Sequence, residues 1–218
     1  MFSKIADNRD GMSLATQFRR KRFALFQSLL AKVERPVHIL DIGGTEDYWR
    51  MMSLDDDQMF ITLLNLQQEN VTTSNMNSMA GDARDIQVLD QSFDIVFSNS
   101  VIEHVGTIDD QSKMANEVRR VGKRYFVQTP NRYFPLEPHF LFPLFQFLPV
   151  KLRVWMLQKF DLGWFKRETD AVKAREIVES IRLLNKKEFS ALFPEATIYE
   201  EKIFGLTKSF VVYGGWNN

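Results

Sequence analysis

One acidic residue and two glycines near position 40 have the types and the spacing of a cofactor site. Asp41 lies near the end of the apolar run 37–42, and Gly43 and Gly44 follow it directly. Without a Cβ, the two glycines let the backbone approach a ligand closely. A carboxylate at a strand end can accept a charge-assisted hydrogen bond from a cofactor's ammonium group or from backbone amides. The stretch predicts a site for a nucleotide-like cofactor. The structural alternative is a tight turn in which Asp41 caps a helix.

The order of these residues separates two cofactors. A dinucleotide-binding fold has a G-x-G-x-x-G turn, and its acidic residue follows ~20 positions later. In this chain Asp41 precedes the glycines, and the dinucleotide glycine pattern is missing. The arrangement therefore favours S-adenosylmethionine over NAD.

Two of the three histidines follow strand ends and are candidates for proton transfer. Histidine titrates near neutral pH, so His104 and His139 could each act as a general base toward an acceptor. Glu137 lies two residues before His139 and suggests a charge partner for it, so His139 is ranked above His104 as the candidate base. The structural alternative for both is a bond to a backbone carbonyl. His38, inside the apolar strand, is predicted to be a satisfied core residue, and with three histidines and no cysteine no dedicated metal site is expected.

Composition permits one compact domain and excludes several classes of chemistry. The chain has 218 residues, of which 44% are hydrophobic, so it can bury a sizeable core. Its 28 basic and 28 acidic residues cancel, and no nucleic acid partner is expected. The absence of cysteine excludes disulfides, thiolate metal sites and a cysteine nucleophile. The first ten residues lack an apolar core of signal-peptide length, which favours a cytoplasmic location.

Strand-like and helix-like segments alternate along the chain, as they do in parallel sheets with crossover helices. The predicted strands are 37–42, 59–66, 93–98, 124–128, 196–204 and 207–213, and the clearest predicted helices are 16–33 and 109–121. Only Gly205 and Leu206 join the last two strands, so these two must be antiparallel. In the first helix, the basic run Arg19 to Arg22 is predicted to be a solvated face.

With these elements in order, the chain resembles the class I S-adenosylmethionine-dependent methyltransferases, especially methyltransferase type 11. Four segments carry the resemblance: Leu40-Asp-Ile-Gly-Gly44, Gly81-Asp-Ala83, Phe93-Asp-Ile-Val-Phe-Ser-Asn-Ser-Val-Ile-Glu-His-Val105 and Arg124-Tyr-Phe-Val-Gln-Thr-Pro-Asn131. The resemblance implies an α/β fold. This is a Rossmann-like seven-stranded mostly parallel sheet with a C-terminal antiparallel hairpin and helices on both faces. It also implies that the cofactor lies across the carboxyl ends of the strands.

The resemblance assigns cofactor contacts residue by residue. The residues that match cofactor-binding positions are Asp41, Gly43, Gly44, Asn65, Asp82, Ala83 and Asn99. Asp82 would meet the adenine amino group; its structural alternative is an Asx turn. The chain departs from the family pattern twice, because Thr45 replaces a third glycine and Asn65 replaces the acidic residue that accepts bonds from the ribose hydroxyls. A neutral amide makes weaker bonds there, and Glu69 is the alternative partner.

Substrate choice is predicted to depend on the insertion between the fourth strand and the last helix. We expect a single methyltransferase domain over 1–218, with an N-terminal helical segment at 1–34 and a helical lid at 131–185. The run 140–150 carries no charge and is too short to span a bilayer, which takes ~20 residues. The next stretch, 151–160, is basic and amphipathic. Four roles stay open for 140–165: a lid on its own domain, a cover over an apolar substrate, a peripheral membrane contact, or a subunit interface.

The sequence thus predicts an S-adenosylmethionine-dependent methyltransferase whose acceptor is a small molecule or is linked to a lipid. The catalytic candidates are His104 and His139. An alternative is a non-catalytic module that keeps the fold and binds cofactor or membrane. An NAD-dependent oxidoreductase is disfavoured by the missing dinucleotide glycines. The oligomeric state is left open.

Overall fold

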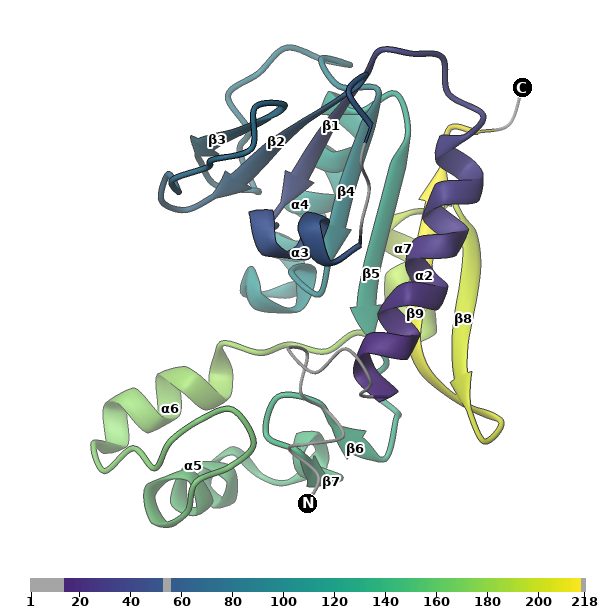
Figure 1. The fold of residues 1–218 in the computed structure, drawn as a ribbon. Helices are drawn as coiled ribbons and strands as arrows, with labels where there is room; N and C mark the ends of the chain where they lie inside the picture. The colour runs from purple at the N-terminus through teal and green to yellow at the C-terminus, as the bar shows by residue number, and fades with distance from the viewer. Residues whose placement is uncertain (1–13, 53–55, 217–218) are drawn as a thin grey trace.

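A seven-stranded sheet forms the centre of the molecule (Figure 1). The computed structural model describes residues 14–52 and 56–216. The strand order is β3-β2-β1-β4-β5-β9-β8. The strands are β1 Val37–Ile42, β2 Met59–Asn65, β3 Met76–Ala80, β4 Ile95–Asn99, β5 Tyr125–Pro130, β8 Thr197–Ile203 and β9 Leu206–Gly214. The first five are mutually parallel, and β9 is antiparallel to both β5 and β8. The predicted fold and the predicted closing hairpin are confirmed.

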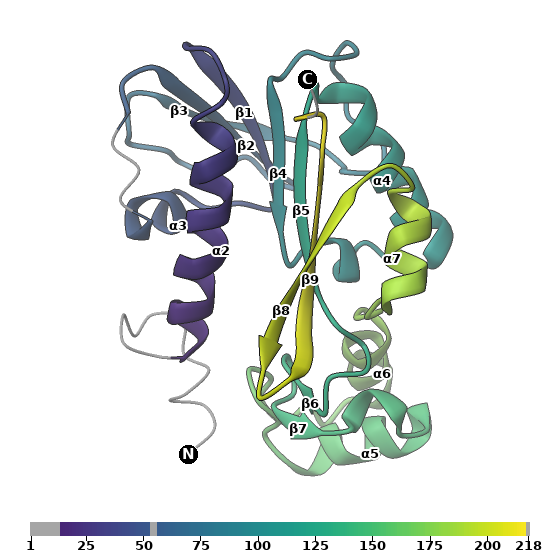
Figure 2. The same cartoon turned by 90° about the vertical axis from the view of Figure 1, so that its right-hand side faces the viewer.

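The strands are apolar because helices cover both faces of the sheet. In β1, Val37 and Ile39 face one layer of the core, and Leu40 and Ile42 face the other. Helices α2 (Leu14–Leu30) and α3 (Glu46–Met51) pack on the first face, and α4 (Ile108–Val121) and α7 (Lys186–Leu192) pack on the second. Figure 2 shows the sheet edge-on between these two layers.

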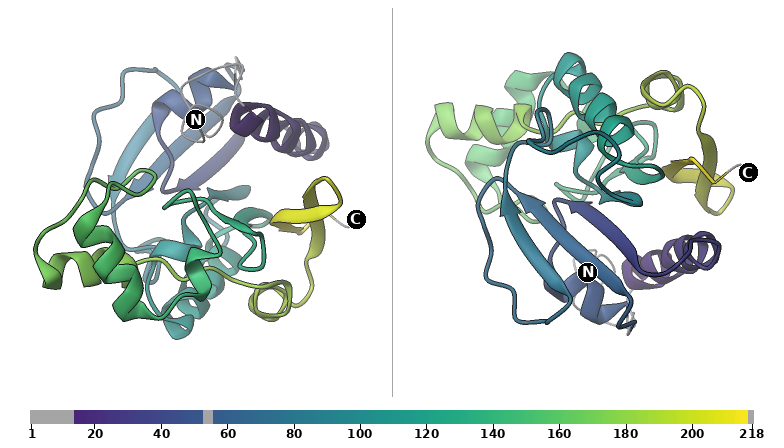
Figure 3. Two further views of the ribbon diagram at one scale, coloured as in Figure 1. Left: turned by 90° about the horizontal axis from the view of Figure 1, so that it is seen from below. Right: turned by 90° about the horizontal axis from the view of Figure 1, so that it is seen from above.

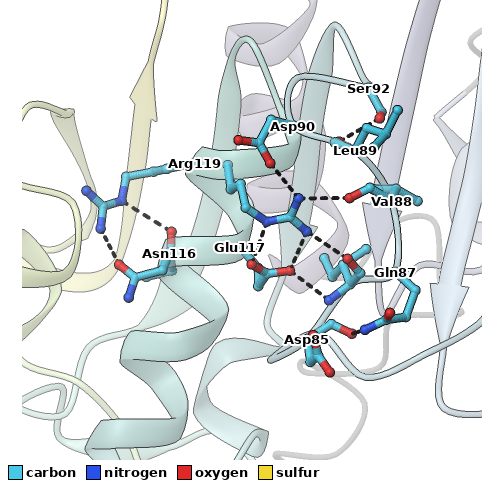
Figure 4. A network of polar contacts seen from close by, with 12 residues as sticks. Asp85, Gln87, Val88, Leu89, Asp90, Ser92, Asn116, Glu117 and Arg119 are labelled. Atoms are coloured by element: carbon cyan, nitrogen blue, oxygen red, sulfur yellow. Dashed lines mark hydrogen bonds and ion pairs between the residues drawn. The ribbon is translucent and has the colours of Figure 1, made fainter.

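Side-chain bonds cap α4 at its start and, near its end, fix the loop that follows Asp82. At the start of α4, Thr107 and Asp110 form a reciprocal capping box. Near its end, Arg120 donates hydrogen bonds to the carbonyl oxygens of Ile86 and Val88, at 2.7 and 2.8 Å (Figure 4). Glu117 accepts from Arg120 and from the backbone amide of Ile86. The segment after Asp82 is thereby tied to the outer face of α4.

The insertion after β5 lies below the carboxyl ends of the parallel strands (Figures 1 and 3). It contains the short pair β6 (Leu136–Glu137) and β7 (Phe142–Pro143), the 3-10 turn η2 (Phe145–Phe147), and helices α5 (Val150–Lys159) and α6 (Ala171–Glu179). These elements share a small core of their own, which consists of Phe140, Phe145, Met156, Leu157, Leu162, Ala174 and Val178.

Two residues differ from their sequence-based interpretation. His38 is exposed rather than buried in the core, and its ring stacks on Phe60 with 5.2 Å between the centroids. It lies near the amino end of β1, where the neighbouring Phe60 is itself 39% exposed. Arg22 is not on a solvated face, because it is 4% exposed and lies one helical turn before the buried Phe26. The helical period therefore directs Arg22 toward the sheet.

The buried Arg22 forms a two-pronged ion pair with Glu201 of β8. Its Nε and Nη2 atoms lie 3.0 and 2.6 Å from the two carboxylate oxygens of Glu201. Ser209 of β9 also donates to that carboxylate, and Gln128 of β5 accepts from Arg22 at 3.0 Å. The network attaches the first helix of the chain to the last strands.

We predict that Arg22→Ala lowers the free energy of unfolding by about 3–5 kcal/mol, because it leaves the buried Glu201 carboxylate without its counter-charge. Urea unfolding followed by circular dichroism measures the change. Arg20→Ala, at an exposed position on the same helix, is the matched control and should change stability by less than about 0.5 kcal/mol. Equal effects of the two substitutions would show that the pair does not anchor α2.

Candidate active site

The glycine turn after β1 is shaped around the Asp41 carboxylate. Gly43 has φ +72°, in the left-handed region that favours glycine. At Gly44, an added Cβ would lie 1.7 Å from the Asp41 Oδ2 atom, so any side chain there would displace the carboxylate. Thr45, which replaces the third glycine of the family pattern, is the N-cap of α3 and accepts a bond from the Tyr48 amide.

Asp41 is buried with one of its two oxygens unpaired. Its side chain is 1% exposed, and Oδ2 accepts a bond of 2.7 Å from the Trp49 indole Nε1. Oδ1 is also buried and has no partner among the described residues. Burial raises the pKa of this carboxyl to about 8, and the bond from Trp49 only partly opposes that rise. Asp41 can therefore receive one further hydrogen-bond donor, and a cationic donor would favour the ionised form.

Asn65 lies beside the same turn. At the end of β2 it donates a bond of 2.9 Å to the Gly44 carbonyl oxygen, so it holds the turn in place. Its side-chain oxygen is the group that remains for a ligand. Glu69, the alternative partner, is exposed on the loop after β2. Both residues lie at the carboxyl edge, where the resemblance puts the ribose.

Asp82 and Ala83 follow β3 at the next position along this edge. Asp82 accepts a bond from the Arg84 backbone amide at 2.9 Å, which makes the Asx turn considered above. The Arg84 guanidinium also binds both carboxylate oxygens, at 2.9 and 2.6 Å, and these bonds lower the Asp82 pKa. Asp82 is thus held as a carboxylate that is partly open to solvent, and Ala83 is 9% exposed against the core.

Asn99, at the end of β4, is engaged by Arg22. The Arg22 guanidinium donates to the Asn99 side-chain oxygen as well as to Gln128 and Glu201. This leaves the Asn99 amide N–H groups for other partners. Arg22 and Gln128 were missed by the sequence analysis; the helical spacing from Arg22 to Phe26 is the signal that could have indicated a buried arginine.

The two catalytic candidates meet on the acceptor side of the edge. His104 ends the short turn η1 (Ile102–His104), and His139 follows β6 in the insertion. Their rings are perpendicular, with 4.8 Å between the centroids. Glu137 is 2% exposed, and its Oε1 lies 2.7 Å from His139 Nδ1, as the spacing in the sequence suggested. Its other oxygen accepts from the backbone amides of His139 and Phe140.

The two histidines have opposite pKa shifts. Around His104, desolvation on its packed side and the neighbouring His139 lower the pKa to about 4. Burial opposes protonation of His139, but the bond and the charge of Glu137, with the charge of Glu103, raise its pKa overall. The pair therefore combines a His104 that is neutral at neutral pH with a His139 that binds a proton more readily than an ordinary histidine.

Glu103 adds a buried carboxyl to this pair. It is fully buried, accepts one bond of 3.0 Å from the Thr129 hydroxyl through Oε2, and has no partner for Oε1 among the described residues. Burial raises its pKa to about 7, with His139 acting in the opposite direction. Metal-ligating atoms of Glu103, His104 and His139 lie within 4.8 Å of one another. The absence of a dedicated metal site stays a prediction.

Comparison with known proteins also points to a methyltransferase. Residues 40–125 match the model of a family described as methyltransferase domain. Among curated proteins, the chain is 38% identical over 58 residues to the uncharacterized proteins MT1557 and Rv1509 of two Mycobacterium tuberculosis strains. That match covers 27% of this chain and only 20% of each relative.

Solved structures resemble the whole chain. A SAM-dependent methyltransferase from Aquifex aeolicus aligns over 98% of this chain and 97% of its own, with a TM-score of 0.54 and 12% identity. The PH0226 protein from Pyrococcus horikoshii aligns over 94% and 92%, with a TM-score of 0.57 and 18% identity. At such identities the likeness shows the fold.

Residues 40–125 thus match a methyltransferase domain, and the chain shares the fold of a SAM-dependent methyltransferase of known structure. The predicted resemblance is confirmed. No helix in 14–52 or 56–216 is both long and apolar enough to cross a bilayer.

The Asp41 pKa predicts how stability depends on pH. Because burial raises the folded-state pKa from 3.8 to about 8, the native state holds a proton that the unfolded state loses between these values. The free energy of unfolding of the wild type, relative to Asp41→Asn, should fall by up to about 1.4 kcal/mol per pH unit over that interval. Urea unfolding at a series of pH values measures the difference, and the Glu103 titration cancels because both proteins contain it. A pH-independent difference would contradict the shifted pKa.

Proposed function

We propose that this protein transfers a methyl group from S-adenosylmethionine to a small-molecule or lipid-linked acceptor. The observation that carries the proposal is the unpaired, buried Asp41 oxygen beside a turn with no side chains. A buried polar atom without a partner is costly, and a ligand that donates to it removes that cost. The α-ammonium group of S-adenosylmethionine is such a donor.

The proposed cofactor contacts follow from this anchor. When bound, S-adenosylmethionine supplies a methyl group that its sulfonium has already activated. Asp41 would bind the ammonium group, and Gly43 and Gly44 leave room for the methionine part. Asn65 and Asp82 would receive the ribose and the adenine, with Ala83 and Asn99 lining the site. The protein's own task is then to align the acceptor and to remove its proton.

For a hydroxyl acceptor, we assign proton removal to the His104 and His139 pair. His104 is exposed on one side and its lowered pKa keeps it neutral at physiological pH, so it can accept a proton. Glu137 orients His139 through Nδ1, and in its protonated form His139 would support charge that develops on the acceptor. This reverses the earlier preference for His139 as the base.

We also propose that residues 131–185 form a lid over the acceptor, within a single methyltransferase domain. Phe140 and Phe145 are buried in the small core of the insertion, whereas Phe147, Trp155 and Phe160 are between 45% and 54% exposed. Large exposed aromatic side chains favour an apolar partner. An acceptor with an apolar part, or a peripheral membrane contact through 140–165, would cover them.

A non-catalytic module with this fold is the second candidate. Arg84 occupies the Asp82 carboxylate and Arg22 occupies the Asn99 oxygen, and Asn65 offers ribose no charge. These contacts favour weak cofactor binding. The full His104, His139 and Glu137 arrangement favours catalysis instead.

Calorimetry with S-adenosylhomocysteine tests the cofactor proposal. Asp41→Ala should weaken binding by about 1.5–3 kcal/mol, the contribution of a hydrogen bond to a charged group. Asp47→Ala, which removes an exposed carboxylate of the neighbouring helix, is the matched control and should bind like the wild type. Unchanged affinity of Asp41→Ala would exclude the ammonium contact, and no binding to folded wild-type protein would exclude the cofactor assignment.

Turnover with a hydroxyl acceptor tests the proposed base. His104→Ala should lower kcat about 10²–10⁴-fold, the typical contribution of general-base catalysis. In the wild type, kcat should stay constant as the pH falls from 7 to 5, because the His104 pKa is lowered to about 4 and its neutral form persists. His38→Ala, at the opposite edge of the sheet, is the control and should leave kcat unchanged.

Two outcomes would contradict the assignment of His104. Loss of rate with an ordinary histidine pKa near 6.5 would mean that another histidine is the base. Loss of turnover in a chelator, restored by a divalent ion, would mean that Glu103, His104 and His139 bind metal instead.

A further inference from the structure

A cavity of about 250 Å³ lies inside the insertion, behind His139. Its walls come from β6, η2, α5 and α6 and from the segment before α7. The apolar part of the wall is formed by Phe140, Phe145, Val178, Ile181 and Leu183, and the polar part by Arg132, Glu137, Gln146, Arg153 and Arg182. This volume is at or below the lower end of the range for whole-ligand sites, so the cavity suits one chemical group rather than a large molecule.

The cavity has an excess of positive charge. Three arginines line it and only one acidic residue, Glu137, whose carboxylate is already bound by His139 and two backbone amides. Arg182 is paired with Glu188 and Gln111. The side chains of Arg132 and Arg153 make no hydrogen bond or ion pair within the described part of the chain.

Two polar atoms in the wall are buried without partners. One is a donor, Nε of Arg153, and the other is an acceptor, Oε1 of Gln146. The Gln146 side chain cannot turn freely, because its Nε2 donates to the carbonyl oxygens of Arg132 and Phe134 at 2.8 and 2.9 Å. Burial lowers the Arg153 pKa, and Glu179 and Glu137 only partly oppose this. Buried polar atoms are normally paired, and the described residues supply no partner for these two, so both are available to a ligand.

We infer that this cavity binds a phosphate group that carries a neighbouring hydroxyl, and that this group is the anchor of the methyl acceptor. The phosphate oxygens accept from Arg153 and Arg132, and the hydroxyl donates to Gln146 Oε1. Arginine suits this role because its planar guanidinium can bind phosphate through two parallel bonds. The assignment to the acceptor, but not the anion site itself, rests on the proposed methyltransferase function.

The position of Glu137 connects the anchor to the catalytic candidates. Its side chain lines the cavity on one side and bonds to His139 Nδ1 on the other. A molecule held by its phosphate in the cavity therefore has its remaining atoms one side chain away from the histidine pair. Both a free polyol phosphate and a phospholipid headgroup have the required chemistry, and the exposed Trp155 of α5 is compatible with either.

Titration of the full-length protein with glycerol 3-phosphate tests this inference. Calorimetry should show one site, with weaker binding of inorganic phosphate, which lacks the carbon-bound hydroxyl. Arg153→Gln and Arg132→Gln should each weaken binding about 10- to 150-fold, the loss of a hydrogen bond to a charged group. Arg167→Gln, at an exposed position of the same insertion, is the matched control and should bind like the wild type.

Two further experiments identify the source of the phosphate and test the site without relying on variants that could misfold. Binding to phosphatidylcholine vesicles only when they contain phosphatidylglycerol, whose headgroup carries free hydroxyls beside its phosphate, and its loss in Arg153→Gln, would support a lipid headgroup. Binding of glycerol 3-phosphate alone would support a free molecule. In the wild type, the Nε–H resonance of Arg153 should shift on titration. No binding of either probe, equal binding by Arg153→Gln and Arg167→Gln, or an unmoved resonance would overturn the inference. Binding of S-adenosylhomocysteine is measured separately, so each proposal can fail alone.

Discussion

The arrangement of the site depends on a carboxyl group that is buried with half of its hydrogen-bonding capacity unused. Asp41 is the penultimate residue of β1, the central strand of the five parallel ones, beside a turn whose two glycines exclude side chains, and Trp49 occupies only one of its oxygens. Burial without a counter-charge holds the pKa of this carboxyl near 8. No cation among residues 14–52 and 56–216 pairs with it, so the site is adapted to a ligand that brings one.

The surrounding elements bury the Asp41 carboxyl group and form the walls of the site around it. Arg22 and Glu201 attach α2 to β8, which closes one side of the carboxyl edge. Arg120 fixes the loop after Asp82 on the opposite face. The insertion covers the edge from below and brings His139 to His104 (Figure 3). Polar groups therefore collect at one edge of the sheet, where parallel strands end.

Local patterns were sufficient to predict six strands of the sheet and the turn, but not β3; the seventh strand was implied only by the resemblance. The apolar run 37–42 and its glycines predict β1 and the place of Asp41, and the two-residue link at Gly205 predicts the antiparallel hairpin. Long-range pairings were not predictable in this way. Nothing near Arg22 in the sequence indicates that its partner is Glu201, 179 positions away. The unpaired side-chain atoms of Gln146 and Arg153 likewise depend on how the insertion folds on itself. His38 was misread because strand composition does not reveal which residues a helix layer leaves uncovered.

The most direct test of the account is the pKa of Asp41 itself, measured by ¹³C NMR of the aspartate carboxyl groups, with Asp41→Asn to assign the signal. Without ligand, the account predicts a pKa of about 8. With saturating S-adenosylhomocysteine, whose ammonium group supplies the missing cation, the pKa should fall well below neutral. An ordinary aspartate pKa without ligand, or a raised pKa that the ligand does not change, would contradict it.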